Sequence, residues 1–189
     1  MHRQGPAGAK GGAGEAQATG ANPTDRGKCG SKRHLLTEGK GVPVALVLSG
    51  ANRTDMKKLA DLLDAKVIEP PAPVAAAAAD GAGPAEAGPH LTLDRGYDYD
   101  ECREVAVARG YTVHIPPKRS AEHPLPPPGH PDRHPPRRWV VEVAHSWFNR
   151  FRRLLIRWEK RPEHYLAFVQ LAACLIVYRK LRHARRLSG

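Results

Sequence analysis

The chain has 189 residues, of which 41% are hydrophobic, and its 18 Gly and 18 Pro indicate substantial loop sequence. Three scattered cysteines argue against a disulfide framework, and the longest apolar stretch, 14 residues (165–178), is too short for a membrane span. Residues 1–30 contain no apolar run, so we expect no signal peptide. Residues 116–189 carry 16 Lys and Arg against five Asp and Glu, so the entire net charge of +11 lies there. We therefore expect a soluble, cytoplasmic protein whose basic part meets phosphate, with a solvated basic tail as the alternative.

The first half of the chain predicts two strands and a helix. Residues 1–30 are rich in Gly and Ala and are expected to be disordered, with order beginning near Lys32. The runs 34–37 and 42–48 are typical of two strands joined by a Gly-containing turn. Thr54 or Asp55 then caps a helix with leucines at helical spacing.

The second half alternates short strands with helices. Residues 68–90 form an Ala/Pro-rich tract that we interpret as a flexible insertion, and residues 116–136 form a Pro/His-rich loop. Between them the patterns predict a strand at 91–93, a helix at 98–109 and a strand at 111–115. Two helices, 137–158 and 163–186, complete the chain.

This order of elements predicts an α/β fold in which helices cover a sheet. It resembles the ribonuclease-H-like fold, a mixed sheet flanked by helices, with its first strand missing. The domain boundaries that follow are 1–30 for the basic N-terminal segment, 31–160 for the α/β domain and 161–189 for a basic C-terminal helix packed on it.

Two carboxylates stand out in this layout. Asp94 follows a short strand, where ligands collect in open α/β sheets, although Asp is also common in turns. Glu142 lies on the polar face of the 137–158 helix, on the side that also carries Arg138, His145, Asn149 and Arg153. The opposite, apolar stripe contains Val140, Ala144, Trp147, Phe151, Leu154 and Trp158. From periodicity alone Glu142 is either a metal ligand or part of a solvated face.

Four ordered blocks carry a resemblance to a known family. They are NPTDRGKCGSKRHLLT (22–37), VLSGANRTD (47–55), LDRGYD (93–98) and RWVVEVAHSWFNRFRR (138–153). Together they resemble the DDE transposases of the insertion sequence five family. The resemblance implies that Asp94 is the second catalytic acid and Glu142 the third, with Arg138 preceding it.

The resemblance also implies residues that hold phosphate. The related superfamily pattern has a Tyr upstream of the Glu and a Lys seven positions after it, where this chain has Pro135 and Asn149. A basic role at that place would pass to Arg150 or Arg153. We expect Arg138, Asn149, Arg150 and Arg153 to contact DNA phosphates.

The chemistry that the resemblance implies is phosphodiester transfer at the ends of an insertion sequence. Two Mg²⁺ (or Mn²⁺) ions would stabilise the attacking and leaving oxygens, and such hard cations take carboxylate ligands. The implied partners are DNA, as transposon ends and target, and a multimer or an upstream transposase product. The implied location is the nucleoid in the cytoplasm.

The family's first catalytic Asp has no counterpart that we can identify, because Asp25 lies in a loop-like context rather than on a strand. We therefore expect weak or no transposition by this chain alone. The alternative is a non-catalytic DNA-binding remnant of a transposase.

Other residues suggest competing sites. His123, His130 and His134 lie far apart in the Pro-rich loop, unlike the tight pairs of a zinc site, and His145 lies on the helix. We expect Trp147 and Trp158 to pack in the core, while Trp139 is open to either core packing or base stacking. The terminal run 179–186 supports backbone binding to DNA without sequence specificity, or simply a charged helix end.

Overall fold

The computed structural model describes residues 18–23, 26–69, 88–117 and 139–187 and has the expected mixed α/β character. Several predictions concern the remaining residues and lie outside the described ones. These are the disorder of 1–17, the insertion over 70–87, the loop over 118–138, the three loop histidines, Asp25 and Arg138.

The N-terminal part is a hairpin of two long strands with a short strand beside it. β2 (Cys29–Thr37) and β3 (Pro43–Gly50) pair antiparallel, with Leu35 opposite Leu46, and β1 (Gly20–Ala21) pairs with the start of β2. The turn closes at Gly41, whose φ of +86° favours glycine. The predicted strands and turn are confirmed, but order begins before Lys32 because β1 holds the start of β2.

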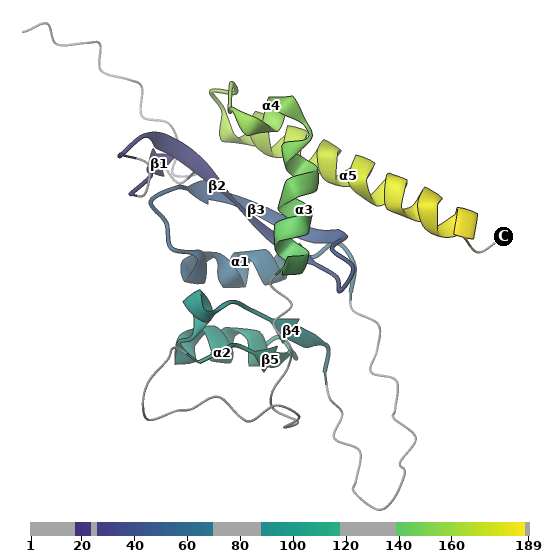
Figure 1. Ribbon diagram of the computed structural model, residues 1–189. Coiled ribbons are helices and arrows are strands. Elements are labelled where there is room, and N and C mark those ends of the chain that lie inside the picture. Colours follow the sequence, from purple (N-terminus) through teal and green to yellow (C-terminus); the bar gives the residue numbers. More distant parts are fainter. Residues whose placement is uncertain (1–17, 24–25, 70–87, 118–138, 188–189) are drawn as a thin grey trace, which may run out of the picture.

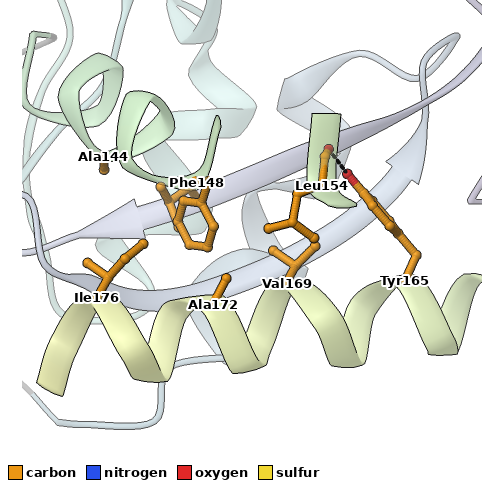
Figure 2. Close-up of a cluster of buried hydrophobic side chains, with 8 residues drawn as sticks. Ala144, Phe148, Leu154, Tyr165, Val169, Ala172 and Ile176 are labelled. Carbon is orange, nitrogen blue, oxygen red and sulfur yellow. Dashed lines mark hydrogen bonds between the residues drawn. The ribbon is translucent and has the colours of Figure 1, made fainter. Parts of the chain in front are cut away.

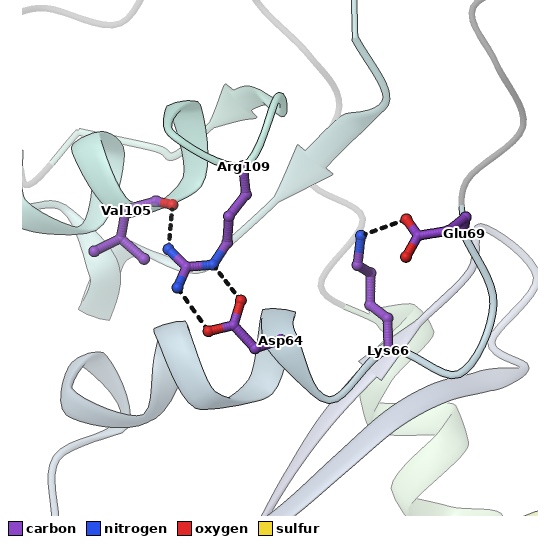
Figure 3. Close-up of polar contacts among 5 residues, drawn as sticks. All are labelled: Asp64, Lys66, Glu69, Val105 and Arg109. Carbon is purple, nitrogen blue, oxygen red and sulfur yellow. Dashed lines mark hydrogen bonds and ion pairs between the residues drawn. The ribbon is translucent and has the colours of Figure 1, made fainter.

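The predicted helix after residue 54 begins as a 3₁₀ turn, η1 (Asp55–Lys58), and continues as α1 (Leu59–Asp64). Next come β4 (His90–Thr92), the 3₁₀ turn η2 (Arg95–Tyr97), α2 (Asp100–Val107) and β5 (Thr112–His114). α1 and α2 meet β4 in one buried cluster. A bidentate ion pair joins the C-terminal end of α1 to the segment that follows α2. The Arg109 guanidinium donates to both Asp64 carboxylate oxygens at 2.6 and 2.7 Å, and also to the Val105 carbonyl (Figure 3).

The described strands lie in two sheets rather than in one. β1, β2 and β3 form the first, and β4 and β5 pair parallel in the second, with Leu91 opposite Val113. α1 lies between the β2–β3 hairpin and the β4–β5 pair (Figure 1). A single mixed sheet is therefore not formed by the described strands, because none of them bridges β2 and β4.

The C-terminal helices depart from the prediction at one point. The expected helix 137–158 is interrupted: α3 (Trp139–Asn149) ends, Phe151 is extended with ψ of 98°, and α4 (Arg152–Leu155) is a single turn. Trp158 lies beyond this break and is 69% exposed, so its predicted core role is wrong, whereas Trp147 packs partly buried against the core. Trp139 is 60% exposed.

The last predicted helix is confirmed as α5 (Pro162–Leu187), which begins at a proline, a residue suited to the first helical turn. Its Tyr165, Val169, Ala172 and Ile176 pack against α3, α4 and β2 (Figure 2). The Tyr165 hydroxyl also donates to the Leu154 carbonyl at 3.0 Å. A search of the described helices finds none that is long and apolar enough to cross a membrane.

Candidate functional site

A cleft of about 1130 Å³ lies between the β2 edge and the β4 edge. Its walls include residues 31–39 of the first sheet and 89–94 of the second. α1 contributes Leu59 and Leu62, and α3 contributes Val140, Val141, His145 and Asn149. Residues that are far apart in sequence thus surround one space.

One end of the cleft is acidic and contains Asp94. This residue is the N-cap of η2, and its exposed carboxylate accepts a hydrogen bond from the Gly96 amide at 2.7 Å. A Cβ at Gly96 would lie 2.8 Å from the same oxygen, which favours glycine there. Burial and the nearby carboxylates of Asp55 and Asp94 raise the pKa of Tyr97, which borders the cleft together with both acids.

A chain of polar contacts connects this end to the first sheet. His34 Nε2 lies 2.7 Å from Ser49 Oγ, and His34 Nδ1 lies 3.5 Å from Asp55 Oδ1. The residue types match a hydrolase triad, but Ser49 is fully buried and its hydroxyl also donates to the Gly50 carbonyl. Ser49 is inaccessible to a substrate, so the arrangement orients Asp55 and joins β2 to β3.

The α3 side of the cleft combines His145 and Asn149 with Arg33 of β2. An Arg33 Nη2 proton is donated to Asn149 Oδ1 at 2.8 Å, and the guanidinium lies 5.9 Å from the centre of the Phe148 ring. Burial and the Arg33 charge lower the pKa of His145. The other guanidinium nitrogen, Nη1, is buried without a hydrogen-bond partner among the described residues.

Sequence reasoning missed Arg33, Asp55 and His34. The available signal for Arg33 and His34 is a run of basic residues, Lys32 to His34, that leads into an apolar pair within β2. The sequence pattern predicts only a helix cap at Asp55. Their proximity depends on the pairing of distant segments, which periodicity within one segment does not reveal.

Glu142 is exposed on α3, two turns before Asn149 on the same side of the helix. It is not part of the cleft wall, whereas Asp94 is. Across the part of the chain that the structure describes, no three His, Cys, Asp or Glu side chains come together as metal ligands. The carboxylates have the oxygen chemistry that Mg²⁺ takes, but the described arrangement does not bring Asp94 and Glu142 together with a third acid.

The predicted phosphate contacts have different surroundings. Arg153 donates to Glu159 at 2.9 Å and lies 5.1 Å from the centre of the Phe168 ring. Arg150 is exposed just after α3, and Asn149 is bonded to Arg33 as described above. Arg153 thus has a structural partner, and Arg150 faces solvent.

A second basic surface lies at the C-terminal end of α5. A shallow hollow of about 210 Å³ is lined by Arg179, Arg182, His183 and Arg186. Nearby, Lys180 lies 3.9 Å from the centre of the Trp147 ring, which ties this end of α5 to α3. The exposed cations are suited to a polyphosphate backbone.

Comparison with known proteins gives two matches. A family model described as "Transposase DDE domain" matches residues 2–177. A Burkholderia cepacia protein that carries the name of a transposase for insertion sequence element IS402 is 39% identical over 166 residues, covering 88% of this chain and 71% of the relative. No solved structure matches.

Proposed function

The chain belongs to the DDE transposase domain family, and on that premise we propose that it takes part in metal-dependent cleavage and joining of DNA strands at insertion-sequence ends. The substrate is DNA in the nucleoid, as transposon ends and target. The observation that carries the proposal is the cleft, which has an exposed carboxylate, Asp94, at one end and the basic residue Arg33 in its wall.

The proposed roles follow from position. Asp94 is placed at the end of a strand by its N-cap bond to Gly96, which fixes its carboxylate toward the cleft. Glu142 is proposed as the third catalytic acid of the family, on the same side of α3 as Asn149, which borders the cleft. The fold is proposed to be ribonuclease-H-like, with residues 31–160 as the domain and 161–189 as its basic helix.

Divalent ions are generally used by DDE domains, and when bound they stabilise the attacking and leaving oxygens of a phosphodiester. Asp94 and Glu142 are the proposed ligands. Arg138, Asn149, Arg150 and Arg153 are proposed to orient the DNA backbone beside them. Multimers and an upstream transposase product are proposed as further partners.

We further propose that the 189-residue chain does not join strands by itself. Support comes from the number of acids: within the described residues no third carboxylate joins Asp94 and Glu142 in a group of metal ligands. Two carboxylates alone hold a pair of metal ions poorly. Joined products from the purified chain in Mg²⁺ would contradict this part of the proposal.

Manganese binding tests the assignment of the acids. Free Mn²⁺ is titrated by electron paramagnetic resonance against the wild-type chain, Asp94→Asn, Glu142→Gln and the control Asp61→Asn, an acid paired with Lys58 on α1. We expect both site variants to lose Mn²⁺ affinity at least about tenfold, because each removes a charged ligand. The control should keep wild-type affinity.

The competing function is a DNA-binding remnant, which the basic hollow on α5 favours. Electrophoretic mobility shifts of a short duplex separate the two. A remnant retains DNA binding in every variant and shows no Mn²⁺ binding that depends on Asp94 or Glu142. The proposed enzyme retains DNA binding and shows that dependence.

A further inference from the structure

The cleft is bordered by two strands whose facing edges pair with no other described strand. Among the described strands, Ser31–Thr37 of β2 pair only with β3, and Leu91 and Thr92 of β4 pair only with β5. No backbone hydrogen bond joins these two cleft-facing edges to another described segment. Strand edges of this kind are templates for a further strand.

The two edges run in opposite directions. At the acidic end, Asp55 contacts Lys32 and His34 of β2, and Asp94 follows the end of β4. The turn η1, which begins at Asp55, contacts η2, which Asp94 caps, so the two acids lie at the same end of the cleft. The end of β2 therefore lies away from the end of β4. A strand between them would pair antiparallel with one edge and parallel with the other, as neighbours do in a mixed sheet.

The opposite end of the cleft confirms this direction. The Val67 amide donates to the Val44 carbonyl at 3.2 Å, and Val44 lies beside the end of β2. The neighbouring Lys66 lies 5.4 Å from the centre of the Tyr111 ring, which precedes β5. Because β5 is parallel to β4, the end of β2 lies near the start of β4.

Both faces of this space are covered by apolar side chains. Consecutive residues of β2 point to opposite faces: Leu35 belongs to the core with α3 and α5, and Leu36 packs on the core with α1 and α2. Leu59 and Leu62 border the cleft on the α1 side, and Val140 and Val141 on the α3 side. A strand covered on both faces is an almost continuous apolar run.

We propose that the cleft is a docking site for a β-strand of a partner polypeptide, a run of about six mainly apolar residues that bonds to β2 and β4 and joins the two sheets. The buried Arg33 Nη1, which lacks a hydrogen-bond partner among the described residues, gains an acceptor from a carbonyl of that strand. The proposal rests on the strand edges and the apolar lining. It does not depend on the transposase function.

The probe for the test is a fluorescein-labelled peptide. Its core is a run of six residues drawn in turn from Val, Ile and Leu, and a Gly-Ser pair flanks the core on each side. A matched peptide has the same side chains with every core amide N-methylated, which removes the N–H donors needed for pairing with the strand edges. Anisotropy with the full chain should show binding of the first peptide at least about tenfold tighter than the second. Hydrogen–deuterium exchange should slow at 31–37 and 90–94 when the first peptide is bound.

Two adjacent exposed residues provide matched variants that leave the core untouched. Ile68 borders the cleft and is 65% exposed, whereas Val67 is 80% exposed and does not border it. Ile68→Asp should weaken peptide binding about tenfold because the strand covers an apolar side chain there. Val67→Asp should bind as wild type does.

Four results would overturn the proposal. The first is that the N-methylated peptide binds as tightly as the unmodified one, and the second is that the bound peptide slows exchange in segments other than the two edges. The third is that Ile68→Asp and Val67→Asp weaken binding equally. The fourth is that exchange at 31–37 is already slow in the chain without peptide. In the last case another occupant, such as residues 1–17 or a second copy, already fills the cleft. Exchange measured over a series of protein dilutions would distinguish these two, because only the binding of a second copy depends on protein concentration. Neither Mn²⁺ nor DNA is involved, so failure here leaves the proposed function standing.

Discussion

At the scale of single residues, the acidic end of the cleft is built by side chains that position one another. His34 links the buried Ser49 to Asp55, the Asp55 and Asp94 carboxylates lie close enough to Tyr97 to raise its pKa, and Gly96 leaves room for the Asp94 carboxylate. Most of these contacts join separate segments, whereas that between Asp94 and Gly96 is local. Substitutions of these residues should therefore change the stability of the chain in a way that depends on pH.

The pH dependence of stability tests the His34 contact. Burial lowers the pKa of His34 from its ordinary 6.5, and Asp55 only partly offsets this, while Lys32, Lys58 and His145 act in the same direction as burial. Below about pH 6.5 the unfolded chain binds a proton that folded His34 resists, so the stability present above that pH is lost as the pH falls. His145 contributes in the same direction.

Urea unfolding at about pH 7.5 and about pH 5.5 measures this loss. The wild-type chain should be less stable at the lower pH, and His34→Gln should show a smaller difference between the two. His183→Gln, on the exposed end of α5, should behave as wild type. An undiminished difference in His34→Gln would show that another group carries the pH dependence.

At the scale of elements, sequence patterns predict the presence of strands and helices better than the residues at which they begin and end. The strands of the hairpin and α5 follow directly from apolar runs and periodicity. The helix wheel also placed Val140 and Ala144 correctly in the core. It failed at Trp158 because α3 ends at Asn149, and a wheel that continues through a break assigns faces to residues that are no longer helical.

The candidate site was only partly predictable for a related reason. Asp94 stands at a strand end next to Gly96, which a local pattern shows. Arg33 and Asn149, 116 positions apart, meet through packing of α3 on β2. Such a pairing leaves no signal within either segment.

The packing of the C-terminal helices on β2 predicts a large difference between two phenylalanines. Phe148 is fully buried in the cluster formed by α3, α4 and α5 (Figure 2), whereas Phe168 of α5 is 40% exposed. Phe148→Ala should lower the free energy of unfolding by about 3–5 kcal/mol. Phe168→Ala should lower it by less than about 1 kcal/mol, in line with surface positions.

Chemical denaturation of the two variants, with far-ultraviolet circular dichroism as the readout, measures both values. Comparable losses in the two would mean that α5 packs through its other face.

At the scale of the whole molecule, positive charge is concentrated in the C-terminal part of the sequence. The excess positive charge lies in residues 116–189, and the described part of it ends in the arginines of α5. Asp55 and Asp94, by contrast, belong to the electrically neutral first 115 residues. In the proposed complex the basic residues of α3 and α5 hold the DNA backbone, and the acids come from a different part of the chain.

The salt dependence of DNA binding tests the basic surface. Each phosphate contact contributes about −0.9 to the slope of log K against log salt. Arg182→Gln and Arg186→Gln should each reduce the magnitude of the slope by about one, as measured by fluorescence anisotropy on a short duplex. Lys40→Gln, an equal loss of charge in the β2–β3 turn, should leave the slope unchanged. Equal slopes in all the chains would indicate that the end of α5 does not hold DNA.

Whether Asp94 and Glu142 hold the same ion is tested most directly by iron-mediated cleavage of the polypeptide. Fe²⁺ bound in place of Mg²⁺, with ascorbate and peroxide, cuts the backbone next to its ligands, and mass spectrometry locates the cuts. In the presence of duplex DNA, we predict cuts near both residues 94 and 142, with both sets lost together in Asp94→Asn and in Glu142→Gln. Cuts near only one of these residues, or cuts that survive both substitutions, would contradict a shared metal site.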